Sequence, residues 1–257
     1  MKKYNFVAPC HFGIEAVLKR EIQDLGYDIV KVEDGRVTFE GDISAICRAN
    51  IFLRTAERVL LQVGRVKATT YDELFEAVKA MDWEDYIPED GKFWVKKASS
   101  IKSKLFSPSD IQRIVKKAIV EKLKLKYRVN RFAETGNEYP LRVVFYKDEA
   151  IIALDTSGDS LHKRGYRKNT AKAPISETLA AALIMLTPWN KDRILVDPFC
   201  GSGTTMIAAI DSQRNSIGVE TEAFYCDHIL NRIDNEYGMF KDFELSYTDL
   251  TNEKDQY

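Results

Sequence analysis

Histidine and cysteine, which hold many metal ions and build disulfide frames, are scarce in this chain of 257 residues. It has three histidines, which are dispersed, and four cysteines without Cys-x-x-Cys spacing. We therefore expect no metal site, and reduced thiols of the kind found in a cytoplasmic protein. No apolar run approaches about 18 residues and the start has no signal-peptide pattern, so we expect neither a membrane span nor secretion.

A net excess of charge is also missing, because the formal net charge is only −1. The charges are nevertheless segregated: residues 92–131 have 13 Lys and Arg against two acids, whereas residues 211–257 have 11 acids against four Lys and Arg. A basic surface raises the local concentration of polyanions. Residues 92–131 are therefore expected to contact RNA or DNA; an ordinary solvated helix face is the alternative.

The first 66 residues alternate between helix and strand patterns. The pattern predicts strands over residues 4–8 and 57–66, helices over 12–24 and 43–50, and a hairpin on either side of Asp34-Gly35. Asp-Gly favours a type I′ turn, which needs positive φ at both residues. The block predicts a small sheet with helices on one face.

Residues 67–156 begin with a capping box, in which Thr70 is followed three residues later by Glu73. A strand is expected over residues 92–98, and two more over 141–147 and 150–157 with a turn at Asp148-Glu149. Between them, Ser107 as N-cap and Pro108 at the first position predict a helix over 107–124. The basic residues that we expect to contact RNA in this block are Lys102, Lys104, Arg113, Lys116 and Lys117.

Residues 157–173 form a second basic segment, rich in Gly and Ser, which predicts a linker. Tyr166 lies between two arginines, and aromatic rings and guanidinium planes are the groups that stack on unpaired bases. The expected RNA contacts here are Lys163, Arg164, Tyr166 and Arg167. A flexible, solvated linker is the alternative.

The stretch "RILVDPFCGSGTTMIAA" predicts a strand over residues 193–197, a glycine turn with Gly201 and Gly203, and a helix over 204–210. Doubly wound folds bind ligands at such turns, because glycines let the ligand approach and the helix start offers free N–H groups. A second strand ends at the acid Glu220 and a third at Asp249. Acids at such strand tips accept hydrogen bonds from ribose hydroxyls, so half of a Rossmann site for an adenosine-bearing ligand is expected. A plain tight turn is the alternative.

Several of these motifs together resemble the THUMP-domain family of S-adenosylmethionine-dependent RNA methyltransferases, which methylate guanine N2 of large-subunit ribosomal RNA. The resemblance covers roughly residues 1–210. The motifs that carry it are DPFCGSGT, APISETLAAALIML, LHKRGYR, GRVTFEGD, CRANIFLRTAERVL, SIKSKL and SDIQRIVKKAIVEKL. The resemblance implies an α/β fold with an α+β amino-terminal part. It also implies four segments, which are a ferredoxin-like subdomain (1–66), a THUMP domain (67–156), the basic linker (157–173) and a partial Rossmann-like methyltransferase domain (174–257).

The same resemblance implies S-adenosylmethionine as cofactor and structured RNA, ribosomal by family, as partner. Glu220 would bind the ribose, Asp249 would lie near the adenine, and Pro174 and Glu177 would lie beside the methionine end. The residues that would line the methionine and adenosine are Asp197, Phe199, Gly201, Gly203 and Thr204.

One family motif is absent from the sequence. Amino-group methyltransferases position the target nitrogen with an Asn/Asp-Pro-Pro-Tyr/Phe turn, yet none of the seven prolines in this chain is adjacent to another. No catalytic residue is therefore assigned. The residues after 174 have room for only three strands, so we expect a shortened domain whose missing half, or a partner chain, completes the site. From about residue 210 the spacing resembles DNA amino-methyltransferases of permuted motif order.

Three functions remain open at this stage. The first is an RNA methyltransferase acting on an exocyclic amino group. The second is a non-catalytic RNA-binding module whose half-Rossmann domain is structural or senses a ligand, which the absent motif favours. The third is a DNA amino-methyltransferase, against which the amino-terminal resemblance argues. Cofactor binding without methyl transfer would select the second.

Overall fold

The computed structural model describes residues 2–163, 175–187, 190, 192–211, 214–237, 246 and 248. The chain forms two compact units: residues 1–168 with 174–186, and residues 169–173 with 187–257. Each unit combines helices with strands, in agreement with the predicted α/β class. Among the described residues, no helix has both the length and the apolar character that crossing a membrane requires.

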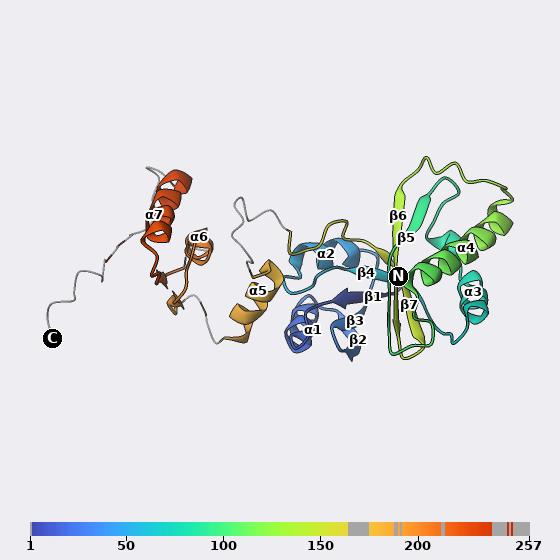
Figure 1. Cartoon of the computed structure of the whole chain (residues 1–257), viewed down its shortest axis with the longest axis horizontal. Coiled ribbons are helices and arrows are strands. Elements are labelled where there is room, and N and C mark those ends of the chain that lie inside the picture. Colours follow the sequence, from blue (N-terminus) through green and yellow to red (C-terminus); the bar gives the residue numbers. More distant parts are fainter. Residues whose placement is uncertain are drawn as a thin grey trace. The chain divides into compact units, whose positions relative to one another are not determined.

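The first part of the larger unit has the element order βαββαβ (Figure 1). Its elements are β1 (Tyr4–Pro9), α1 (Glu15–Asp24), β2 (Asp28–Glu33), β3 (Arg36–Gly41), α2 (Ala45–Phe52) and β4 (Leu60–Lys67). The strands lie in the order β2-β3-β1-β4, and every neighbouring pair is antiparallel. Apolar residues of the two helices, such as Leu18 and Ala49, share one buried core with Phe6 and Phe39 of the sheet.

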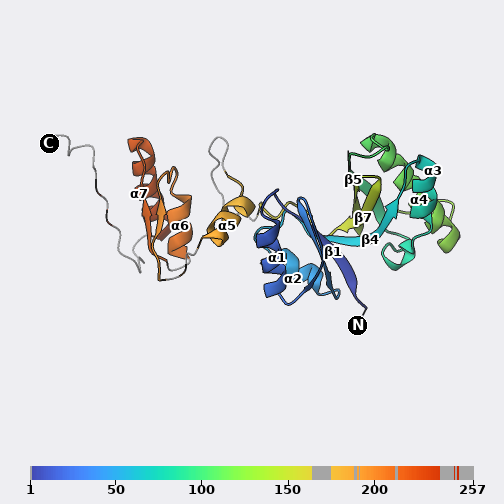
Figure 2. The ribbon, with the colours of Figure 1, turned by 90° about the horizontal axis from the view of Figure 1, so that it is seen from below.

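The second part of this unit extends the same sheet (Figure 2). Its elements are α3 (Tyr71–Lys79), the short 3-10 helix η1 (Trp83–Asp85), β5 (Lys92–Ile101), α4 (Pro108–Tyr127), β6 (Glu138–Tyr146) and β7 (Glu149–Asp155). β7 pairs with β4, and β6 and β5 follow, so seven strands form one sheet in the order β2-β3-β1-β4-β7-β6-β5. The pair β5–β6 is parallel, whereas the others are antiparallel. A further helix, α5 (Glu177–Leu186), belongs to this unit.

The two predicted helix starts in this second part are confirmed. Thr70 accepts the backbone N–H of Glu73 while the Glu73 carboxylate accepts that of Thr70, which completes the capping box. The hydroxyl of Ser107, the residue directly before Pro108, accepts a hydrogen bond from the backbone N–H of Asp110. The helix α4 then runs three residues beyond the predicted end. It ends at Tyr127, and the C-cap residue that follows, Arg128, has a left-handed φ of 57°. Its buried stripe is Ile111, Val115, Ala118, Ile119 and Leu123.

The predicted type I′ turn at Asp34-Gly35 is wrong, because only Gly35 of the pair has a positive φ. Tertiary contacts set this turn: the Gly35 N–H donates to the Glu15 carboxylate of α1, and its carbonyl accepts the N–H of Cys10. Two consecutive positive φ values occur instead at Lys147 and Asp148, between β6 and β7, one residue before the predicted turn.

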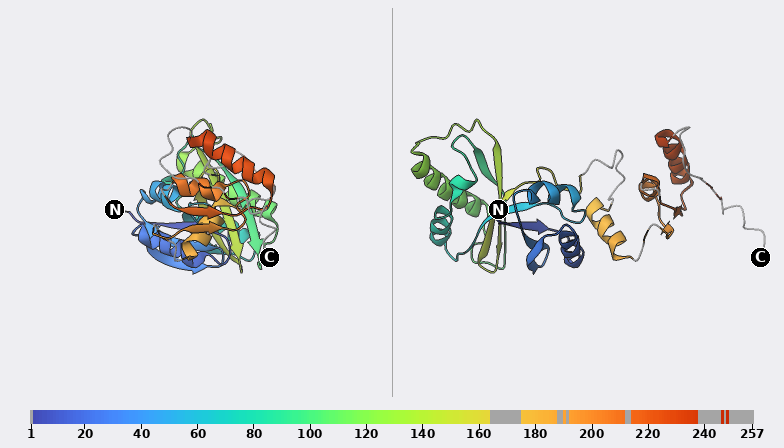
Figure 3. Two further views of the ribbon diagram at one scale, coloured as in Figure 1. Left: turned by 90° about the vertical axis from the view of Figure 1, so that its left-hand side faces the viewer. Right: turned by 180° about the vertical axis from the view of Figure 1, so that it is seen from behind.

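The smaller unit contains a parallel pair of strands flanked by two helices (orange to red in Figure 3). Its described elements are β8 (Leu195–Asp197), α6 (Thr204–Asp211), β9 (Ser216–Gly218) and α7 (Ala223–Tyr237). Ile207, Ile229 and Ile233 form its small core together with Cys200. The third strand predicted around Asp249 falls outside the described residues.

A buried carboxylate joins the two parts of the large sheet. Asp155, at the end of β7, has a fully buried side chain that accepts hydrogen bonds from Arg58, at 2.9 Å, and from Arg142 of β6, at 2.8 Å. Arg58 also donates to the carbonyl of Gly158 and to Ser160. The loop that follows β7 is thereby fixed to the segment that precedes β4.

We expect Asp155→Asn to lower the free energy of unfolding by about 3 kcal/mol, because two largely buried guanidinium groups lose their counter-charge. Urea unfolding followed by circular dichroism measures the change. The exposed Asp159→Asn, four residues along, is the control and should stay within about 0.5 kcal/mol of wild type. Equal stability of both variants would contradict a structural role for the buried carboxylate.

Candidate functional site: the loop after β8

The predicted strand, glycine turn and helix are present in the smaller unit. β8 and β9 pair in parallel, with Asp197 opposite Gly218, so both strands point their carboxyl ends to one edge. α6 begins at Thr204, directly after the turn. The Asp197 carbonyl accepts the N–H of Val219, and the N–H of Cys200 donates to the Val219 carbonyl. The turn is therefore held over the end of β9.

Both predicted glycines adopt left-handed backbone conformations, with φ of 48° at Gly201 and 74° at Gly203. Their surroundings differ. A Cβ on Gly201 would meet nothing within 4 Å, whereas a Cβ on Gly203 would lie 2.8 Å from Ile229 of α7. Gly203 therefore serves helix packing, and Gly201 leaves the backbone open to a ligand.

The carboxylate of Glu220 binds the turn. It accepts the backbone N–H of Gly201 at 2.8 Å, of Thr221 at 2.8 Å and of Glu222 at 3.1 Å. These donors, the Glu222 N–H foremost, hold the pKa of Glu220 below its ordinary value although partial burial opposes them. The acid stays ionised, and its oxygens keep lone-pair capacity for further donors.

The second predicted acid lies beside the same turn. The Asp197 carboxylate accepts the N–H of Phe199 at 3.1 Å. Burial first, and then the negative charges of Asp197 and Glu220, raise the pKa of the Cys200 thiol. One buried sulfur thus lies in the field of both carboxylates. Phe199 extends outward with 86% of its surface exposed.

Two features of this site were not anticipated from the sequence. Arg232 of α7 donates to the carbonyl of Ser202 and to the hydroxyl of Thr204, and so fixes the start of α6. Gly218 faces the sulfurs of Met206 and Cys200, and a Cβ there would lie 2.9 Å from the Cys200 sulfur. Neither contact joins neighbours in sequence, so no local pattern could have indicated it.

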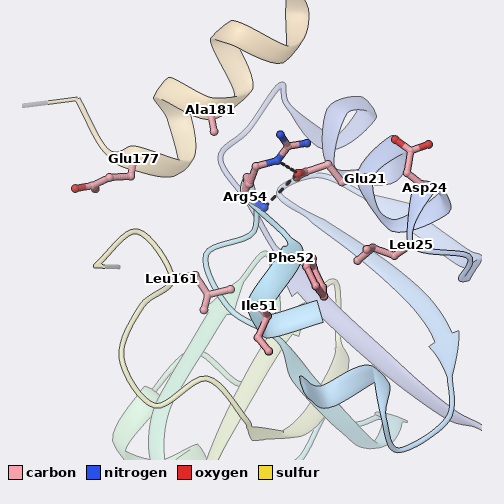
Figure 4. Close-up of a pocket in the computed structure, with 9 residues that line it drawn as sticks. All are labelled: Glu21, Asp24, Leu25, Ile51, Phe52, Arg54, Leu161, Glu177 and Ala181. Carbon is pink, nitrogen blue, oxygen red and sulfur yellow. Dashed lines mark hydrogen bonds and ion pairs between the residues drawn. The ribbon is translucent and has the colours of Figure 1, made fainter. Parts of the chain in front are cut away.

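The remaining predicted cofactor residues are Pro174, Glu177 and Asp249. Pro174 and Asp249 lie outside the described residues. Glu177 begins α5 in the larger unit, at the rim of a pocket of about 570 Å³ between α1, α2 and α5 (Figure 4). Its carboxylate points away from the Arg54–Glu21 ion pair in that pocket.

The start of α5 belongs to a network that no pattern in the sequence predicted. Glu57 accepts the hydroxyl of Thr178 and lies 3.0 Å from the Nδ1 atom of His162. Its other near neighbour is the Nε2 atom of His11, at 3.3 Å. Burial raises the pKa of Glu57, but the hydrogen bonds of Thr178 and His162 outweigh it, so the net pKa is lowered. One carboxylate therefore joins His11 near the amino terminus, His162 within the predicted linker and Thr178 of α5.

The predicted RNA contacts of the larger unit are exposed. Lys102 and Lys104 lie in the loop after β5, and Arg113, Lys116 and Lys117 lie on α4. Within the described part of the chain, only Arg113 of these five has an ion pair, with Asp110. Lys163 is exposed too, while Arg164, Tyr166 and Arg167 fall outside the described residues. No group of three metal-ligating side chains occurs among the residues described.

Family models match three consecutive parts of the chain. They are the RlmL ferredoxin-like domain at residues 5–60, the THUMP domain at 68–155 and the RMKL-like methyltransferase domain at 164–249. The predicted fold class is thereby confirmed: a ferredoxin-like domain and a THUMP domain precede a partial methyltransferase domain.

Curated relatives agree with this assignment. The chain is 57% identical over 211 residues to YpsC of Bacillus subtilis, which is named as a candidate RNA methyltransferase; the match covers 81% of this chain and 54% of that protein. A second candidate RNA methyltransferase, from Synechocystis, is 33% identical over 77% of this chain and 51% of its own length. The chain spans about half the length of the curated relatives it matches.

Solved structures share the fold. A Listeria monocytogenes protein described as a candidate N6-adenine-specific DNA methylase has a TM-score of 0.81 at 43% identity, over 91% of this chain and 72% of its own. SMU.472, a candidate methyltransferase solved in complex with S-adenosylhomocysteine (SAH), has a TM-score of 0.79 at 36% identity, over 93% and 74%. Fold and turn together define a THUMP-domain protein with a Rossmann-like methyltransferase segment. The chain belongs to the family of THUMP-domain RNA methyltransferases that includes the RlmL and YpsC types.

We expect Gly203→Ala to destabilise the smaller unit more than Gly201→Ala. Both substitutions carry the left-handed backbone cost of about 1–2 kcal/mol, but only the first also overpacks against Ile229, for about 1–3 kcal/mol more. Hydrogen exchange of α6 and α7 amides measures the difference. Combining Gly203→Ala with Ile229→Ala should recover part of the overpacking loss, and equal effects of the two glycine variants would refute the close contact.

Proposed function

We propose that this chain binds RNA and S-adenosylmethionine as part of a methyltransferase that modifies an exocyclic amino group, guanine N2 of ribosomal RNA in the first instance. The observation that carries the proposal is the Glu220 carboxylate, which lies at the end of β9 and holds the Gly201 turn in front of α6. The domain boundaries 1–66, 67–156 and 174–257 form part of the same proposal.

The residues at the turn fit an adenosine-bearing cofactor. Glu220 has the place and charge to accept ribose hydroxyls, and Gly201 gives the ligand free approach to the backbone. The helix N-terminus at Thr204 offers N–H groups to the carboxylate of a methionine moiety. The SAH held by SMU.472 supports this choice of cofactor. The wider set proposed to surround it is Asp197, Phe199, Gly203, Pro174, Glu177 and Asp249.

The cofactor would supply an activated methyl group on a sulfonium. The part of this chain is then to bind and orient, since direct transfer to an amine needs no covalent enzyme intermediate. The carboxyl groups of Asp197 and Glu220 suit the neighbourhood of a positively charged sulfonium. No residue of the chain is proposed to position the acceptor nitrogen, because the sequence has no two adjacent prolines.

A non-catalytic RNA-binding module is the second candidate, because the exposed basic side chains of α4 support RNA binding whether or not a methyl group is transferred. The two candidates differ in one measurement, which is transfer of radioactive methyl from S-adenosylmethionine to ribosomal RNA fragments. Transfer by the isolated chain selects the enzyme. Binding of both RNA and cofactor without transfer selects the module.

We expect Glu220→Ala to weaken SAH binding about 10-fold or more, because the charged acceptor for the ribose is lost and the turn loses its support. Isothermal calorimetry measures the affinity, and thermal unfolding reports on the fold. Glu222→Ala is the matched control: its side chain is exposed and only its backbone binds Glu220. Unchanged SAH affinity in a folded Glu220→Ala protein would remove Glu220 from the site.

We expect Lys102→Ala with Lys104→Ala to weaken binding of a structured ribosomal RNA fragment and to lower the salt slope of log K by nearly two, because each phosphate contact releases one counterion. Fluorescence anisotropy over a range of salt concentrations measures both. Lys19→Ala with Arg20→Ala, an exposed pair on α1, removes the same charge elsewhere. Identical slopes for the two double variants would show a diffuse charge effect only, and tighter binding of duplex DNA than of RNA would favour a DNA substrate.

A further inference from the structure

A groove runs beside β5, which within the described structure pairs on one side only, with β6. The groove has a volume of about 510 Å³, within the range of small-ligand sites. It separates the strand from the first half of α4. Its lining residues are Trp94, Val95, Gln112, Arg113, Lys116 and Lys117.

The backbone of β5 is not offered here for pairing with another strand. The register of β5 against β6 shifts between Val95 and Lys97, which marks a bulge. The carbonyl of Val95 accepts a hydrogen bond from the Gln112 side chain, at 3.2 Å. Bulges and blocked carbonyls prevent strand addition at a sheet edge. An added β-strand is thus a poor occupant of the groove.

Uncompensated positive charge along α4 is concentrated at the groove. In the second half of the helix, the basic side chains have acidic neighbours: Lys122 lies 3.8 Å from Asp82 and Lys126 3.3 Å from Glu84. In the first half, Lys116 and Lys117 have no ion pair among the described residues, and no acid lines the groove. The Lys117 ammonium lies 5.6 Å from the centre of the Phe75 ring, a contact that leaves its charge intact. The groove therefore selects an anion.

The aromatic wall of the groove is Trp94. Its indole is only partly buried, and the ammonium of Lys92 lies 5.6 Å from the ring centre. Trp83 is the contrasting case, since it is fully buried and its Nε1 donates to the carbonyl of Val78. Of these two described indoles, Trp94 is thus the one available for stacking on a planar ligand. Base stacking on such a ring is sequence-tolerant, because every base has a π-face.

We infer that this groove binds one unpaired nucleotide of RNA, with the base stacked on Trp94 and the adjoining phosphates at Lys116 and Lys117. The inference deepens the RNA-binding part of the proposed function and rests on it. It adds a base-stacking position to a surface that otherwise offers charge alone. The predicted consequence is a preference for unpaired over fully duplex RNA at equal charge.

Trp94→Ala tests this with two labelled probes, a single-stranded RNA hexanucleotide and a blunt RNA duplex, by fluorescence anisotropy in the full chain. We expect affinity for the hexanucleotide to fall about 10-fold, as for the loss of one base stack, and affinity for the duplex to change less than about twofold. Trp94→Phe, which keeps a ring, should recover most of the binding. Lys116→Ala with Lys117→Ala should weaken the binding of both probes and lower the salt slope of log K for both.

Tyr4→Ala is the matched control, because Tyr4 is a half-buried aromatic residue with a lysine ammonium 5.5 Å from its ring but lies on β1, in the ferredoxin-like part. The inference would be overturned if Trp94→Ala lost affinity for the hexanucleotide and for the duplex equally. It would also be overturned if Tyr4→Ala lost as much affinity for the hexanucleotide as Trp94→Ala does. Either result would leave RNA binding in place. Binding of neither RNA by the wild type would overturn the proposed function as well. Competition by poly-glutamate as strong as by RNA would assign the groove to acidic peptide instead.

Discussion

The pairing of β4 on both of its sides is the constraint on which the larger unit depends. β4 pairs with β1 through Leu60 and Leu61, and with β7 along its whole length. The ferredoxin-like and THUMP parts therefore share one sheet and one apolar core. Next to this strand, the buried Asp155 carboxylate forms ion pairs with Arg58 and Arg142. Polar contacts therefore fix the junction between the two parts in addition to the strand pairing. The basic helix α4 is consequently presented by a rigid platform.

A different principle governs the turn after β8. Here the fixed points are backbone groups: one carboxylate, Glu220, gathers three N–H donors from the turn and from its own strand end. The two glycines have separate roles. Gly203 leaves room for the Ile229 side chain of α7, and Gly201 leaves the backbone of the turn uncovered. A preformed turn with an ionised acid would need little reorganisation to bind the proposed nucleoside, and this would lower the entropic cost of binding.

Local signals in the sequence predicted local structure well. The capping box at Thr70 and the start of α4 at Ser107 each depend on residues three positions apart, and both are present. The strand, turn and helix around Gly201 follow one another in a single short stretch, and they are present too. The turn at Asp34-Gly35 was predicted wrongly because Glu15, about 20 residues away, binds it. The Glu57 network and the Trp94 groove were missed for the same reason, since their members come from distant segments. The cofactor and RNA roles of all the predicted site residues, Asp249 and Pro174 included, stay predictions.

The groove and the proposed chemistry impose related demands on RNA. An exocyclic amine of a paired base is engaged in a Watson–Crick hydrogen bond, so a methyltransferase acting there needs an unstacked, unpaired nucleotide. The deep, narrow major groove of duplex RNA admits few side chains, so an exposed indole contacts bases mainly in loops, bulges and ends. On this proposal, a surface that combines Trp94 with lysines that have no ion pair among the described residues would retain the kind of RNA in which a modifiable base is already accessible. Charge alone does not discriminate in this way, because duplex and single strand both carry phosphates.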